Sequence, residues 1–328
     1  MARAQRGLLV QALTRANPWW TRAKGKRMTR SSPRRPERRS STCRAARILF
    51  PDLGDTPRYF LLDEVTAIPE WQHGIKWVRD NTAATGDCII ATGSSARDIA
   101  AGATYLAGRR SPDVRPDRLL LPLSFREFVR CAGYDLPVPP SLRFADFFTA
   151  EGRSACQDAL GYVGTLVDAF ETYLLIGGFP QAVTDFRRTA QVSDGFARDL
   201  WDVVQSDLRA MSVSRLEQGL RLLERIAASL IGPVVLRALA QELDVAHPTI
   251  GLWLDALADA YLVLFLFQES GGIPDVRKQR KVYPIDPFLA RLPARHTPGA
   301  FEPDASRLAE AALAAAIFRA VEGDAVDR

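Results

Sequence analysis

The apolar residues of the chain fall into two patterns, short continuous runs and longer helical repeats. Tyr59–Leu62 and Cys88–Ala91 are continuous apolar runs, which predict short strands, the first of them buried on both faces. A helical repeat that opens near Pro69 lies between them, and Leu119–Leu121 predicts a further core strand. Strand, helix and strand in this order favour an α/β fold with a partial parallel sheet.

From Ala145 onward the apolar spacing is mainly helical. One predicted helix ends at Leu174–Ile176, a second contains Phe196–Val204, and a third covers Leu216–Leu230. The Gly-Gly-Phe-Pro sequence at 177–180 predicts a packing turn between helices. Upstream, Ser124 followed by Glu127 predicts a capping box at the start of a helix.

Residues 232–285 predict a compact module of their own. Helices are expected at Val234–Leu243 and Thr249–Asp259, and strands at Tyr261–Phe267 and Lys281–Ile285. Two helices joined by a short turn and followed by a two-stranded wing are typical of a winged helix. The second helix contains no Lys or Arg, so a packing or protein-binding role is favoured over reading of the DNA major groove.

Composition narrows the class of protein. The chain has 328 residues, of which 47% are hydrophobic and 25% charged, as expected for globular domains. Apolar runs such as Tyr261–Phe267 are too short for a membrane span, so we expect no membrane partner. Four cysteines without a C-x-x-C spacing indicate neither a zinc site nor a disulfide framework, which favours the cytoplasm.

The net charge of +5 is very unevenly distributed. Residues 1–50 contain fourteen Lys or Arg and one acid, so the remainder of the chain is acidic. Residues 6–20 predict a helix, and residues 21–47 have almost nothing to bury and predict disorder. The alternative is a basic arm that binds phosphates. DNA is therefore a candidate partner through residues 21–47 or through the wing at Arg277–Lys281.

Polar side chains follow both predicted strands. Asp63 and Glu64 come directly after the first strand, and Thr92 and Ser94 come directly after the second. Ligands bind at the carboxyl ends of strands in open α/β sheets, so these side chains could share one crevice. Four apolar residues followed by Asp-Glu is the pattern of a Walker B strand; the alternative is a plain strand end with two solvated acids.

The order of five segments resembles the AAA-superfamily ATPases of prokaryotes that have an uncharacterised C-terminal domain. The segments are DEVTAIPEWQHGIKWVRD, IIATGSS, LAGRR, LLLPLSFREF and ETYLLIGGFPQAV. The resemblance implies a RecA-like P-loop core, ATP and Mg²⁺ as ligands, and a winged-helix and nuclease-like end. It implies that Asp63 holds Mg²⁺ through water and that Glu64 is the catalytic base.

The same resemblance suggests roles for three further positions. Thr92 and Ser94 would contact the γ-phosphate. Arg109 or Arg110 would act as an arginine finger, in its own subunit or in a neighbouring one, which makes self-association a candidate interaction. The alternative for the arginines is an ion pair with Asp113 or Asp117 at a loop edge.

One part of the family pattern has no counterpart in this sequence. A P-loop requires G-x-x-x-x-G-K-[ST], whereas Gly25-Lys26-Arg27 lacks both the earlier glycine and the hydroxyl. We expect that the loop has been lost or replaced, for instance by a shifted reading frame, and that ATP hydrolysis is impaired. The alternative function is a non-enzymatic winged-helix or DNA-associated protein.

These observations predict the following organisation. It comprises an N-terminal helix (1–20), a disordered basic segment (21–50), a truncated AAA-type core (51–135), a helical region (136–230), a winged-helix-like module (231–293) and the start of a truncated C-terminal domain (294–328).

Overall fold

The fold is that of a computed structural model. It describes residues 59–81, 87–93, 96–110, 116–136, 146, 148–210, 216–230, 232–270, 273–274 and 280–324. The predicted helix at 6–20 and the basic segment at 21–50 lie outside the described residues, as does Ser94. The chain divides into two compact units, Met1–Pro112 (unit 1) and Asp113–Arg328 (unit 2).

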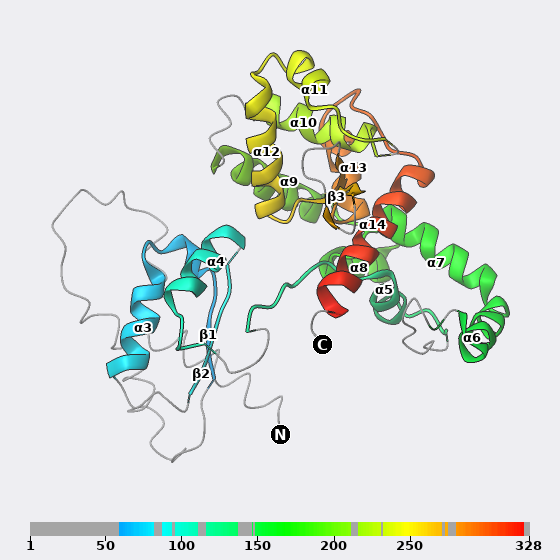
Figure 1. The fold of residues 1–328 in the computed structure, drawn as a ribbon. Helices are drawn as coiled ribbons and strands as arrows, with labels where there is room; N and C mark the ends of the chain where they lie inside the picture. The colour runs from blue at the N-terminus through cyan, green and yellow to red at the C-terminus, as the bar shows by residue number, and fades with distance from the viewer. Residues whose placement is uncertain are drawn as a thin grey trace. The chain divides into compact units, whose positions relative to one another are not determined.

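Unit 1 contains the predicted pair of parallel strands. Its described elements are β1 (Tyr59–Leu62), the 3-10 helix η3 (Val65–Ala67), α3 (Trp71–Asn81), β2 (Cys88–Ala91) and α4 (Ala96–Tyr105). β1 pairs with β2 in parallel, from Tyr59 opposite Cys88 to Leu62 opposite Ala91. Both strands and the helix between them are confirmed, and the helices lie beside the strands in Figure 1.

The first strand is buried on one face only, which corrects the prediction of burial on both faces. Phe60 is buried, while Tyr59 and Leu61 are 58% and 48% exposed. Val78 of α3 and Ala103 of α4 are buried as well. Successive strand residues point to opposite faces, so Phe60 lies on one face of the strand and Tyr59 and Leu61 lie on the other.

The prediction of a strand at Leu119–Leu121 is wrong. These residues have no strand assignment, and Leu120 is 97% exposed. A strand requires a hydrogen-bonding neighbour, and the apolar run alone does not provide one. We call residues 116–123 the connecting segment, because they precede the first helix of unit 2.

Unit 2 is mainly helical, and the fold class is therefore confirmed as a short parallel sheet followed by a helical region. Its helices are α5 (Phe125–Ala132), α6 (Ala150–Leu160), α7 (Val163–Ile176), α8 (Pro180–Thr189), α9 (Asp194–Ala210), α10 (Leu216–Ala228), α11 (Leu236–Glu242), α12 (His247–Asp259), α13 (Pro287–His296) and α14 (Ala305–Asp324). Its strands are β3 (Val263–Phe267), β4 (Glu269–Ser270), β5 (Ile273–Pro274) and β6 (Arg280–Pro284).

One apolar cluster holds these helices together, and all of its members follow Pro112 in the chain. Phe128, Leu222, Leu254 and Phe288 have no exposed surface. They come from α5, α10, α12 and α13, so the core joins helices that are far apart in the sequence. Figure 1 shows α6 and the adjoining end of α7 extending away from these packed helices.

Within the described ranges, no single helix combines the length and apolar content needed to cross a membrane. The helices α6 and α7 pass that test when taken together, but the chain bends by 82° between them.

Candidate functional site

The parallel pairing of β1 and β2 brings the predicted site residues to one end of the sheet. Leu62 and Ala91 are the last paired residues of the two strands. Asp63 directly follows β1 and Thr92 directly follows β2, so their side chains leave the sheet at the same edge. The hypothesis that both strands deliver polar groups to a shared edge therefore agrees with the register.

Asp63 and Thr92 are in direct contact at this edge. The Thr92 hydroxyl donates a hydrogen bond to Asp63 Oδ1 at 2.5 Å. The backbone N–H of Glu64 in turn donates to the Thr92 hydroxyl oxygen at 3.3 Å. The backbone continues the contact, since Thr92 N–H donates to the Leu62 carbonyl at 2.8 Å. The hydroxyl thus orients one oxygen of an exposed carboxylate, which suits water-mediated binding of a hard cation.

Glu64 has a constrained backbone beside this contact. Its φ of 52° and ψ of 43° lie in the left-handed region, which is unfavourable for a residue with a side chain by about 1–2 kcal/mol. Val65 N–H donates to the Thr92 carbonyl at 2.9 Å, so the turn after Glu64 is tied to the second strand. Strained backbone of this kind is frequent where a side chain must be aimed at a ligand.

Arg109 has another partner, which sequence reasoning missed. Its Nε donates to Asp80 Oδ1 at 2.6 Å and its Nη2 donates to Asp80 Oδ2 at 2.9 Å. The hydrogen bond from Arg109 lowers the pKa of the Asp80 carboxyl, and the same bond raises the pKa of Arg109. An ion pair was one of the two interpretations of this arginine, and the partner observed is Asp80 at the end of α3.

The ion pair lies far from the edge that holds Asp63. Arg79, which adjoins Asp80, donates to the carbonyl of Asp87 at 2.7 Å, and Asp87 comes immediately before β2. The end of α3 is therefore at the amino end of the strands, whereas Asp63 and Thr92 are at the carboxyl end. Four-residue strands separate the two ends by roughly 13 Å. The roles of Arg109 and Arg110 as arginine fingers stay predictions.

The described residues contain no group of three or more His, Cys, Asp or Glu side chains that could hold a metal ion by themselves. A Mg²⁺ ion at Asp63 would therefore take most of its ligands from water and phosphate, as this ion commonly does. The donor at Asp63 fits such a role, because the carboxylate is exposed and its other oxygen accepts no hydrogen bond from Thr92.

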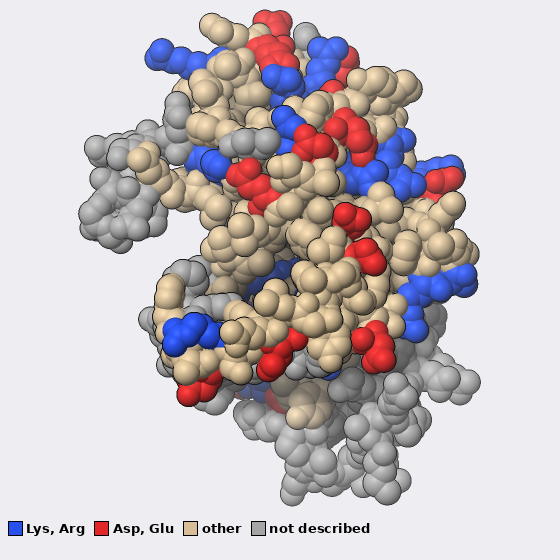
Figure 2. Space-filling model, turned by 90° about the vertical axis from the view of Figure 1, so that its right-hand side faces the viewer, with Lys and Arg blue, Asp and Glu red and all other residues tan. Residues whose placement is uncertain are grey.

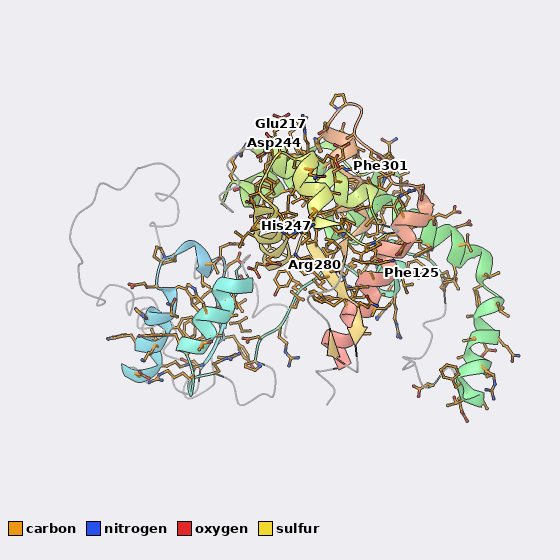
Figure 3. The ribbon with its side chains drawn as sticks, turned by 45° about the horizontal axis from the view of Figure 1, so that its top comes forward. Phe125, Glu217, Asp244, His247, Arg280 and Phe301 are labelled. Atoms are coloured by element: carbon orange, nitrogen blue, oxygen red, sulfur yellow. The ribbon has the colours of Figure 1, made fainter. Side chains whose placement is uncertain are left out.

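In unit 2, the region predicted as a winged helix has helices and strands close to those expected. α11 and α12 are joined by a short turn, and β3 pairs with β6 in antiparallel from Val263 opposite Pro284 to Phe267 opposite Arg280. An isolated bridge joins Val234 to Arg280. Figure 3 labels Asp244 and His247, which line a hollow at the turn together with Arg237 and Gln241.

The cation at the base of the wing is already paired. Arg280 Nη1 donates to Asp255 Oδ1 of α12 at 3.1 Å, and the guanidinium lies 4.3 Å from the centre of the Phe265 ring. Leu252 on the same helix is 69% exposed. The outer side of α12 therefore presents an apolar side chain and a neutralised acid, which is unlike a surface that binds phosphates.

Two family models match the chain. Residues 29–129 match the model described as "AAA domain", and residues 167–296 match the model described as "Domain of unknown function (DUF8612)". No curated protein and no solved structure matches the chain. The first match contains the Asp63 and Thr92 edge, and the second contains α8 to α13. The chain thus combines a region like the P-loop NTPases of the AAA type with a domain of unknown function.

Proposed function

We propose that unit 1 is a nucleotide-binding module of the AAA type whose hydrolytic activity is weak or absent. The contact between Asp63 and Thr92 at the shared end of two parallel strands is the observation on which this rests. The match of residues 29–129 to an AAA domain supports it. In this proposal Asp63 holds Mg²⁺ through water, Thr92 orients that carboxylate, and Glu64 positions the attacking water.

The impairment follows from the sequence. The chain has no G-x-x-x-x-G-K-[ST] string, and such a loop supplies most of the hydrogen bonds to the phosphates. Each charge-assisted bond is worth about 1.5–3 kcal/mol, so losing several weakens nucleotide binding by orders of magnitude. When bound, Mg²⁺ would neutralise phosphate charge beside Asp63.

Isothermal titration of the full chain with ATP and Mg²⁺ tests this proposal. We expect a dissociation constant of about 1 mM or weaker, and no turnover above a blank. Asp63→Asn should abolish the Mg²⁺-dependent part of any binding, while Asp117→Asn outside the edge should not. Micromolar binding with steady turnover would contradict the impairment. Equal Mg²⁺-dependent binding by Asp63→Asn and the wild type would contradict the role of Asp63.

A second candidate function is favoured by the outer side of α12. We infer that residues 231–293 form a winged helix used for contact with another protein. Exposed Leu252 and the pairing of Asp255 with Arg280 support this over DNA reading. Figure 2 shows acidic and basic side chains interspersed on the face drawn, with no single basic area among the residues it describes. DNA contact would then depend on the basic residues 21–47.

Binding to a short DNA duplex at increasing salt separates these possibilities. If residues 21–47 are the DNA-binding element, the affinity should fall steeply with salt and disappear when they are deleted. Leu252→Ala should leave DNA affinity unchanged under that interpretation. A loss of DNA affinity in Leu252→Ala with the basic segment intact would instead indicate that α12 contacts DNA.

A further inference from the structure

The Gly177–Gly178 corner between α7 and α8 joins parts of unit 2 that are far apart in the sequence. The N–H of Gly178 donates to Oδ2 of Asp286 at 2.7 Å across a separation of 108 residues. The carbonyl of Gly178 accepts from the N–H of Leu123 at 2.7 Å. One glycine therefore ties the end of the connecting segment to the residue that caps α13.

Both positions of the corner require glycine. Gly177 has a φ of 70°, and a Cβ on it would lie 2.8 Å from Cβ of Phe288. A Cβ on Gly178 would lie 2.8 Å from the backbone nitrogen of Leu123. Backbone atoms cannot move aside as a flexible side chain can, so any larger residue would push these segments apart.

The connecting segment is held at its end from other directions as well. The Arg319 guanidinium of α14 donates to the carbonyl of Pro122. The Tyr173 hydroxyl of α7 donates to the carbonyl of Leu123 at 3.2 Å. Only three residues earlier, Leu120 is 97% exposed. The anchoring is thus concentrated at Pro122 and Leu123.

Asp286 organises the other side of the corner. The residue is 1% exposed, and its Oδ1 accepts the N–H of Phe288 at 2.8 Å while Oδ2 accepts Gly178. It therefore caps the N-terminus of α13 and fixes the corner with one carboxylate. If this carboxylate is removed, two buried N–H groups lose their acceptor, which is unfavourable for the closed arrangement.

We propose that the glycine corner is a latch that fixes the connecting segment to unit 2, with Asp286 holding it closed. When the latch opens, the N–H of Gly178 loses its acceptor on Asp286, and the N–H of Leu123 loses the carbonyl of Gly178. This inference goes beyond nucleotide binding and does not depend on it.

Amide hydrogen exchange of the full chain, read by mass spectrometry at fixed pH, tests the latch. In Asp286→Ala, peptides that cover Leu119–Ser124 and Gly178 should exchange at least tenfold faster. The N–H of Gly178 loses its acceptor directly, and the N–H of Leu123 loses the fixed position of the Gly178 carbonyl. Peptides from α10 should be unchanged. Gly164→Ala is the matched control, since nothing lies within 4 Å of a Cβ placed there.

A folded Asp286→Ala variant with unchanged exchange at Leu123 would overturn the proposal. If that variant does not fold, the native protein gives the answer. The latch requires the amides of Leu123 and Gly178 to be protected and to open with the same free energy across a denaturant series. An unprotected Leu123 amide beside a protected Gly178 amide would overturn it.

Discussion

Asp286 has a carboxylate that is almost fully buried, because only 1% of the residue is exposed. Burial raises its pKa to about 6, because removal from water disfavours the charged form. The N–H groups of Gly178 and Phe288 and the positive charge of Arg319 act in the opposite direction. Burial raises the pKa of Tyr173 of α7, and the negative charge of Asp286 raises it further.

This pKa predicts a pH dependence of unit 2. The folded-state value of about 6 lies above the ordinary 3.8, so the folded form binds more protons between these values. The resulting stabilisation is present at low pH and is lost as the pH rises through 6, up to about 3 kcal/mol for two pKa units. Urea unfolding at pH 5 and pH 7 measures it. Relative to Asp286→Asn, the wild type should have a lower free energy of unfolding at pH 7 than at pH 5. An equal difference in unfolding free energy between the two proteins at both pH values would contradict the assignment.

At the scale of elements, α5 shows how local sequence determines a helix start. The Ser124 hydroxyl accepts the Glu127 N–H at 3.3 Å, and the Glu127 carboxylate accepts the Ser124 N–H at 2.7 Å. Burial alone would raise the pKa of Glu127, but the hydrogen bonds from Ser124 lower it overall. This capping box was predicted from the sequence and is confirmed.

Loss of this cap should destabilise unit 2 moderately. Ser124→Ala leaves the Glu127 N–H without its side-chain acceptor, and we expect the free energy of unfolding to fall by about 1 kcal/mol in urea titrations. Ser206→Ala, on the exposed side of α9, serves as the control and should change it by less than about 0.5 kcal/mol. Equal effects of the two substitutions would show that the cap contributes nothing.

The comparison of elements explains what sequence can and cannot predict. The capping box involves residues three positions apart, and β1 and β2 each follow from four local residues, so these were predictable. The apolar run at Leu119–Leu121 depends on a neighbouring strand that a one-dimensional pattern does not reveal. The contacts of Arg109 with Asp80 and of Gly178 with Asp286 join distant residues. The Asp-Pro pair at the start of α13 was the available indication that Asp286 caps a helix.

A side-chain cluster also joins β6 to α14. Glu310 Oε1 accepts from Lys281 Nζ at 2.7 Å and from the Tyr283 hydroxyl at 2.6 Å. The hydrogen bond with Glu310 raises the pKa of Lys281. Glu310→Ala removes the acceptor from both donors, and we expect a loss of about 1–2 kcal/mol in unfolding free energy.

The exposed pair of Glu217 with Arg221 provides the comparison for this cluster. Its members are four residues apart on α10, and the Glu217 side chain is 76% exposed. Surface pairs of this kind contribute little, so Glu217→Ala should change the unfolding free energy by less than about 0.5 kcal/mol. Similar losses in the two variants would argue against a special role for the junction of β6 and α14.

For the whole molecule, charge and burial are both divided between parts of the chain. Residues 1–50 hold all of the excess positive charge, because the remaining residues have more acids than bases. The large apolar cluster belongs entirely to unit 2. Among the described residues of unit 1, only a few apolar side chains, including Phe60 and Val78, are buried. The large apolar cluster and the candidate nucleotide site thus lie in different units.

This division predicts that residues 113–328 fold without unit 1. Their core uses no described residue before Leu121, so the fragment retains all of its large buried side chains. We expect one cooperative thermal transition, with a midpoint within about 5 °C of the main transition of the full chain. Leu254→Ala, at a position with no exposed surface, should lower both midpoints equally. A fragment without a cooperative transition would show that unit 2 depends on residues 1–112 for its fold.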